Sequence, residues 1–169
     1  MSDQIQAEID PELTEFSFED SERVTTIWID GYADNPEWDE PEWADHPEAY
    51  RNAVACGHCS YLKDGTDSHM QCAPDWIPAS GIAEIKRCID RFVSGEINEF
   101  GPTPKEFCPG DDMPPFQIAM HRDDGGVSVR LSDNGRHCAD HSIEQELTDV
   151  RLNELQEYFT RISGYWPPR

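Results

Sequence analysis

Two cysteines lie three positions apart in the motif Cys56-Gly-His-Cys59. Thiolate pairs with this spacing are typical of structural zinc sites, in which both sulfur atoms contact the same ion. Gly57, which stands between the cysteines, lets the backbone turn so that amide N–H groups point toward sulfur. The motif therefore predicts the first half of a metal site, with zinc as the favoured ion.

Further cysteines and histidines are candidates for the remaining ligands. Cys72 and Cys108 lie in segments that are rich in turn residues. The predicted site consists of four thiolates, from Cys56, Cys59, Cys72 and Cys108. Cys138 and His141 form an alternative second pair, and His69 or His58 is an alternative to one cysteine. Cys88 falls beside the apolar side of a predicted helix and is interpreted as a small core residue.

Two known families share part of this pattern. The spacing C-x2-C-x12-C loosely resembles the high-potential iron–sulfur proteins, whose fourth cysteine comes sooner, so an iron–sulfur cluster is the alternative cofactor. Cys-Gly-His-Cys also resembles the active site of protein disulfide isomerases, which implies a thiol oxidoreductase with Cys56 as nucleophile. In that resemblance Thr103-Pro104 corresponds to the family's cis-proline, whereas Ala55 and Ser60 replace an aromatic and a basic residue.

A second group of polar residues allows another enzyme hypothesis. Imidazole and carboxylate groups can bind a metal or transfer protons, and they recur in the last third of the chain. The group consists of His121, Asp123, Asp124, His137, Asp140 and His141. The sequence contains no nucleophile-elbow, phosphate-loop or dinucleotide-binding glycine pattern. We therefore assign no catalytic residue and keep a metal-dependent enzyme as the alternative function.

The charge distribution predicts the kind of partner. The 169-residue chain has a net charge of -22, and residues 1–50 hold 16 of the 35 acidic residues and one of the 13 basic residues. This charge disfavours direct binding to nucleic acid and to anionic membranes. We expect a protein partner with a basic surface instead.

The chain has neither an apolar N-terminal segment nor an apolar run long enough to cross a membrane. We therefore expect a cytoplasmic protein without a membrane partner. Cysteines in that compartment are free thiols or metal ligands and rarely form disulfides.

Residues 34–48 combine proline, acidic residues and two tryptophans. Such a composition is typical of segments that become ordered on a partner, although docking onto the chain's own core is the alternative. The candidate partner-binding residues are Trp38, Trp43, Glu37, Asp39, Glu40 and Glu42. The leading hypothesis is a zinc-stabilised interaction or regulatory protein. One form of it is a phage- or plasmid-type decoy that competes with nucleic acid for the basic surface.

Hydrophobic periodicity predicts the elements that position these residues. Alternating and β-branched runs predict hairpins over residues 14–29 and 116–131. A period near 3.6 predicts helices over residues 80–93 and 142–162, with Ser80 and Ser142 at their N-termini. A short helix over residues 48–55 is expected before Cys56. The segments 59–77 and 101–115 are expected to be loops.

The predicted fold class is α+β. We expect one small antiparallel sheet made of the two hairpins, two main helices on one face, and loops tied together by the metal. The expected division is an acidic segment over residues 1–50, which includes the first hairpin, and a metal-stabilised core over residues 51–169.

Overall fold

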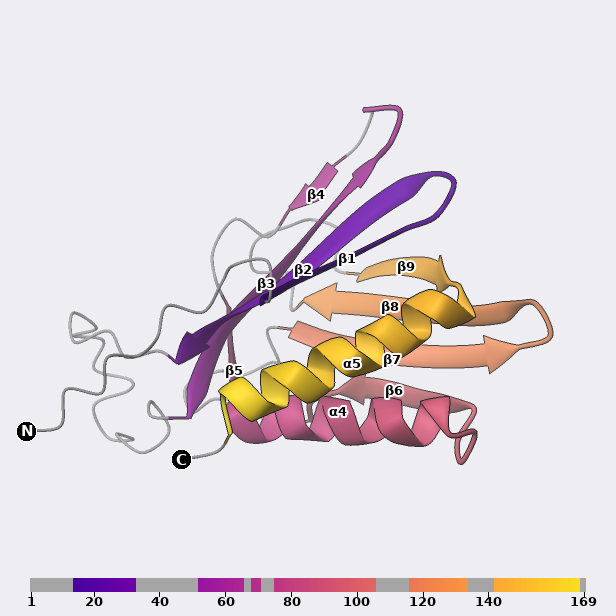
Figure 1. Ribbon diagram of the computed structural model, residues 1–169. Coiled ribbons are helices and arrows are strands. Elements are labelled where there is room, and N and C mark those ends of the chain that lie inside the picture. Colours follow the sequence, from indigo (N-terminus) through magenta and orange to yellow (C-terminus); the bar gives the residue numbers. More distant parts are fainter. Residues whose placement is uncertain are drawn as a thin grey trace, which may run out of the picture.

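The strands and helices are seen in a computed structural model that describes residues 14–32, 52–65, 68–70, 75–105, 116–133 and 142–167. These residues form two antiparallel sheets and two α-helices, which confirms the α+β class. The helices lie side by side and cover one face of the strands (Figure 1). Apolar side chains from both sheets and both helices form one core cluster between these layers.

The first sheet is organised around β3, which pairs with three other strands. Its members are β1 (Glu15–Glu19), β2 (Arg23–Tyr32), β3 (Ala53–Leu62), β4 (Ser68–Met70) and β5 (Asp75–Pro78). β1, β2 and β3 are neighbours in that order, and β4 and β5 both pair with β3, at different ends of it. The pairing of β1 with β2 confirms the first predicted hairpin.

The second sheet has four strands in sequence order. They are β6 (Glu99–Thr103), β7 (Phe116–Asp123), β8 (Gly126–Asp133) and β9 (Ser142–Leu147). β7 and β8 confirm the second predicted hairpin, whose turn residues are Asp124 and Gly125. The expectation of a single sheet was wrong, because the two hairpins belong to different sheets.

The first helix is α4 (Ala79–Val93), and it confirms the prediction for residues 80–93. Its inward side chains include Ile82, Ile85, Ile89 and Phe92, all of them fully buried. The helix begins one residue earlier than expected, and the N-cap is Pro78, which offers no side-chain cap, instead of Ser80. Gly95 follows the helix with φ of 80°, a left-handed conformation that suits glycine at a helix end.

The second helix is α5 (Asp149–Tyr165), which is shorter at its start than the predicted helix over residues 142–162. Residues 142–147 form β9 instead, with Ile143, Gln145 and Leu147 turned inward. The spacing of four between Ile143 and Leu147 fits both a helix and a strand, so periodicity alone does not decide between them. Thr148 is the N-cap, and its side chain accepts a hydrogen bond from the Arg151 N–H at 3.2 Å.

Three other local predictions were wrong. β3 begins at Ala53, where the end of a short helix was expected, and it continues to Leu62. The expected loop over residues 59–77 contains the end of β3 together with β4 and β5, and the expected loop over 101–115 contains the end of β6. Val54 favours a strand but its two alanine neighbours do not, and pairing with β2 and β5 places all three residues in the interior.

The first hairpin is an integral part of the core. Phe16, Phe18, Ile27 and Ile29 lie in the same buried cluster as the helices. The Tyr158 hydroxyl on α5 donates a hydrogen bond to the backbone carbonyl of Thr14 at 2.7 Å, which fixes the start of β1. The folded part of the chain therefore extends into the segment that the sequence singled out as acidic.

Candidate functional site

The two cysteines of the opening motif lie on opposite faces of β3. Their partners on β2 are Ile29 for Cys56 and Thr26 for Cys59, in a ladder without irregularity between these positions. Side chains alternate along a strand, so residues three apart point in opposite directions. Cys56 is fully buried in the core cluster, whereas Cys59 is half-buried on the other face. The structure does not bring the two thiols together, so one metal ion cannot bind both.

The same geometry bears on the redox hypothesis. Three residues of extended chain separate the two Cα atoms by about 10 Å, whereas a disulfide needs about 7 Å or less. Burial raises the pKa of the Cys59 thiol, partly offset by hydrogen bonds with Thr26. Cys56 lies in the middle of a strand and not at a helix N-terminus. The Thr103-Pro104 bond is cis, but this pair of cysteines lacks the features of a dithiol active site.

Gly57 has a packing role that the motif did not suggest. It pairs with Trp28 of β2, and a Cβ atom at position 57 would lie 2.2 Å from Cζ2 of the Trp28 indole. Real carbon–carbon contacts are about 3.5–4.0 Å. The indole therefore lies across the β3 backbone, and glycine is required because any side chain would occupy the same space. Gly57 is part of a regular strand, so the expected metal-binding turn was wrong at this position.

Most of the other predicted metal ligands lie outside the residues that the structure describes. Cys72, Cys108, Cys138 and His141 lie outside the described residues. His69 lies in β4, where it pairs with Ser60 of β3. His58 is buried and lies on the same face of β3 as Cys56, and Cys88 is half-buried on α4, outside the core cluster. In the described part of the chain, no three His, Cys, Asp or Glu side chains are arranged so that they could hold one metal ion.

The histidine–aspartate group is described only in part. His121 and Asp123 lie on β7, with Nδ1 of the imidazole 3.8 Å from Oδ2 of the carboxylate. Asp124 lies in the β7–β8 turn, and His137, Asp140 and His141 lie outside the described residues. The candidate partner-binding residues of the acidic segment also lie outside them: Trp38, Trp43, Glu37, Asp39, Glu40 and Glu42.

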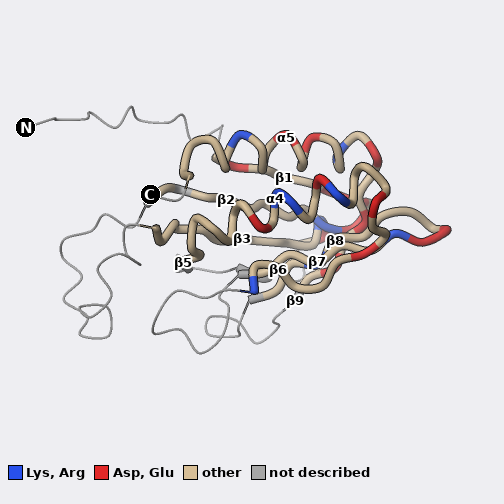
Figure 2. Tube along the Cα trace, turned by 90° about the horizontal axis from the view of Figure 1, so that it is seen from below, with Lys and Arg blue, Asp and Glu red and all other residues tan. Residues whose placement is uncertain are grey.

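A strongly acidic hollow lies where the two hairpin turns meet β9. Its volume is about 550 Å³. Its acidic lining comes from three parts of the chain: Asp20, Glu22, Asp123, Glu144 and Glu146. No lysine or arginine is among the described residues that line it. Figure 2 shows that charged residues gather toward the end of the fold that carries the β7–β8 turn.

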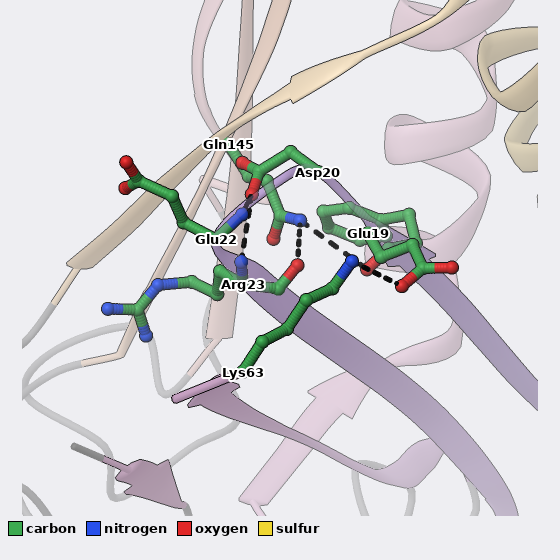
Figure 3. A network of polar contacts seen from close by, with 7 residues as sticks. Glu19, Asp20, Glu22, Arg23, Lys63 and Gln145 are labelled. Carbon is green, nitrogen blue, oxygen red and sulfur yellow. Dashed lines mark hydrogen bonds and ion pairs between the residues drawn. The ribbon is translucent and has the colours of Figure 1, made fainter. Parts of the chain in front are cut away.

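Gln145 forms the floor of this hollow and joins the two sheets. It is buried, and its Oε1 accepts a hydrogen bond of 2.5 Å from the Thr25 hydroxyl. Its Nε2 donates a hydrogen bond of 2.9 Å to the backbone carbonyl of Arg23 and a longer one of 3.5 Å to the backbone carbonyl of Phe18 (Figure 3). Buried amides without partners are costly, so these contacts hold the first hairpin against β9.

The turn above Gln145 is also held by hydrogen bonds. Oδ1 of Asp20 accepts hydrogen bonds from the backbone N–H groups of Glu22 and Arg23, both at 2.8 Å (Figure 3). On its outer side Glu19 forms a 2.8 Å ion pair with Lys63, and this contact lowers the pKa of Glu19. Sequence analysis missed this arrangement, because Gln145 falls in the first turn of the helix that was predicted over residues 142–162. Its alternation with Ile143 and Leu147 was the available signal.

Comparisons with known proteins add no family to this picture. No protein-family model matches the sequence, and no curated protein has significant similarity to it. Neither described helix is sufficiently long and apolar to cross a membrane.

Proposed function

We propose that this protein is an acidic interaction or regulatory protein that binds the basic surface of a partner protein. The observation that carries the proposal is the acidic hollow between the two hairpin turns and β9. Five carboxylates line it, and no basic side chain is among its described lining residues. Like charges that converge in a concave surface create a local field, which attracts a basic partner and accelerates its association.

The arrangement of the hollow supports recognition by a preformed surface. Asp20 is held by its own turn, and Gln145 fixes that turn against β9. A rigid surface loses little conformational entropy when it binds. The carboxylates of Glu22, Glu144 and Glu146 are exposed and therefore accessible to a partner.

The acidic segment over residues 34–48 is the second part of the proposal. Trp38 and Trp43 would supply apolar anchors among carboxylates, a combination suited to the aromatic hot spots and polar rims of interfaces. A nucleic-acid-binding protein is the finer hypothesis for the partner, because its basic surface would accept either phosphates or these carboxylates. The protein would then act as a decoy.

Zinc stabilisation is a separate proposal. A zinc ion could use either Cys56 or Cys59, but not both, together with Cys72, Cys108 and a further ligand from Cys138, His141 or His69. An iron–sulfur cluster is the alternative for the same residues, and a brown colour would distinguish it. The interaction proposal does not depend on either metal.

A binding measurement with a fluorescent oligoarginine peptide tests the interaction proposal. The triple variant E22Q/E144Q/E146Q neutralises the hollow and leaves the turn contact of Asp20 intact. The matched control E15Q/E84Q/E157Q removes the same charge from residues that do not line the hollow. We expect about tenfold weaker binding for the first variant, equivalent to about 1.4 kcal/mol, and a much smaller change for the control. Equal losses in both variants would show that only net charge matters.

The decoy hypothesis needs a second measurement. A basic DNA-binding protein is mixed with labelled duplex DNA, and the intact acidic protein is added as competitor. Release of DNA by the wild type and weaker release by a W38A/W43A variant are the expected results. A competitor that fails to release DNA at any concentration contradicts the decoy hypothesis, while peptide binding in the first assay would still support an interaction protein.

A further inference from the structure

In the described part of the chain, the helices pack on one face of the four-stranded sheet and leave the other face open. The four strands lie side by side in the order β6, β7, β8 and β9 (Figure 1). Ile118, Val129 and Leu131 belong to the core cluster that includes the helices, and alternation along a strand directs their immediate neighbours to the opposite face. On that opposite face Arg130 and Glu144 are exposed. We call this polar side of the sheet the open face.

A single row of side chains crosses the open face from one edge of the sheet to the other. Glu99 of β6 pairs with His121 of β7, and His121 pairs with Ser128 of β8. Ser128 pairs in turn with Glu146 of β9. Directly paired residues point to the same face of a sheet, so these four side chains form one line across the strands. Carboxylates lie at both ends of the line, and an imidazole and a hydroxyl lie between them.

The distance between the two carboxylates follows from the spacing of the strands. Neighbouring strands are about 4.7–4.9 Å apart, so three spacings separate Glu99 from Glu146 by about 14 Å. An extended chain advances about 3.3 Å per residue, and its side chains point to the same side at every second residue. Two residues that are four positions apart therefore lie about 13 Å apart and face the same way. An extended peptide that crosses the strands matches the two carboxylates with this separation.

The surface along the row is hollowed over its whole length. A second hollow of about 620 Å³ is lined by Glu99, His121 and Ser128, and the acidic hollow is lined by Ser128 and Glu146. Both linings include Ser128 and Glu144, so the two hollows adjoin at these residues. Together they form a trough that follows the row from β6 to β9. A trough of this shape suits an extended segment better than a folded surface.

The charges along the trough favour basic side chains at its two ends and not in its middle. Glu99 lies at one end, and at the other end Glu146 belongs to the carboxylates of the acidic hollow. Arg130 lies beside the middle of the row, two residues after Ser128 on the same strand, and it pairs with Glu144. This guanidinium offsets a neighbouring carboxylate and repels a cation on the ligand, so an uncharged middle is favoured.

We propose that the partner presents an extended segment with two basic side chains four positions apart, which lies in the trough between Glu99 and Glu146. One basic side chain contacts each carboxylate, and the uncharged residues between them cross above His121 and Ser128. The inference rests on the proposed function, because the acidic hollow forms one end of the trough. It deepens that function by specifying the shape and the charge spacing of the basic partner.

Fluorescence anisotropy with two labelled peptides tests the spacing at low ionic strength, where exposed charges are least screened. Both peptides contain two arginines among serines and threonines. The arginines are four positions apart in the spaced peptide and consecutive in the adjacent peptide. Glu99→Gln should weaken binding of the spaced peptide about threefold, an effect typical of one exposed ion pair. It should leave the adjacent peptide unaffected, because consecutive arginines fit within the acidic hollow, which Glu99 does not line.

The matched control is Glu157→Gln, which removes the same charge from an exposed position on α5 that lines neither hollow. We expect it to change the binding of both peptides equally and only slightly. Circular dichroism should show that both variants remain folded, because Glu99 and Glu157 are exposed.

The outcomes separate this inference from the proposed function. Equal effects of Glu99→Gln on the two peptides, or no effect on either, would overturn the trough. In that case weaker peptide binding by E22Q/E144Q/E146Q would still support an acidic interaction protein. Failure of the wild type to bind either peptide would contradict both proposals.

Discussion

Replacing Gly57 with alanine perturbs the contact between β3 and the indole of Trp28. The new Cβ atom would lie 2.2 Å from Cζ2, 2.6 Å from Cε2 and 2.8 Å from Cη2 of that indole. Because carbon atoms in contact are about 3.5 Å apart or more, the ring would have to move by about 1.3 Å. Overpacking of this kind costs about 1–3 kcal/mol. An overlap as close as 2.2 Å lies at the upper end of that cost. Alanine in a strand recovers about 0.5–1 kcal/mol relative to glycine, so a net loss of about 2 kcal/mol is expected.

Urea unfolding followed by circular dichroism measures this loss. Gly101→Ala is the matched control, because Gly101 lies in strand β6 and an added Cβ atom there meets nothing within 4 Å. We expect it to leave the free energy of unfolding unchanged or slightly higher. Trp28→Val removes the indole while keeping a residue that favours strands. In that background Gly57→Ala should become neutral or slightly stabilising. The difference between the two backgrounds gives the interaction free energy between the new methyl group and the Trp28 indole.

Two outcomes would refute this reasoning. One is an unchanged free energy of unfolding in Gly57→Ala. The other is an equal loss in the wild-type and Trp28→Val backgrounds, which would mean that the glycine is needed for its backbone and not for the space above it. Metal content measured on the same variants would show whether Gly57 also affects metal binding, as the sequence motif first suggested.

Three further predictions follow from the described contacts. Gln145→Leu should lower the free energy of unfolding by about 2–4 kcal/mol, measured in urea, because buried polar partners on the first hairpin lose their hydrogen bonds. Burial raises the pKa of Asp90, but hydrogen bonds from Lys86 and Gln156 lower it below 3.8 overall. The stabilisation is therefore present above that value and is lost as the pH falls through the lowered pKa, so Asp90→Asn should flatten stability curves in acid. If the purified protein contains zinc, mass spectrometry should show a lower zinc content for Cys56→Ser or for Cys59→Ser, and a loss in both would contradict their placement on opposite faces.

Local patterns predicted the elements whose periodicity is unambiguous. The helix over residues 80–93 has an apolar stripe that only a helix can bury, and the hairpin over residues 116–131 has strict alternation around a glycine turn. The start of the second helix was mispredicted because Ile143 and Leu147 satisfy both periods. In that case the pairing of β9 with β8 decided the conformation.

The candidate sites were less predictable. A C-x2-C motif implies convergent thiols only where the backbone turns, and in β3 the backbone is extended. The acidic hollow combines residues that are more than a hundred positions apart, such as Glu22 and Glu144.

The sequence by itself determined the charge of the protein, its α+β composition and the identity of the buried helical stripe, because these depend on residue type and local spacing. It also supplied the Cys56-Gly-His-Cys59 motif. Only the tertiary structure decided the role of that motif in the described fold. Pairing with β2 makes it part of an extended strand, with the two thiols on opposite faces and the Trp28 indole packed directly against Gly57. Strand alternation separates side chains that are close in sequence, and sheet register brings together others that are distant.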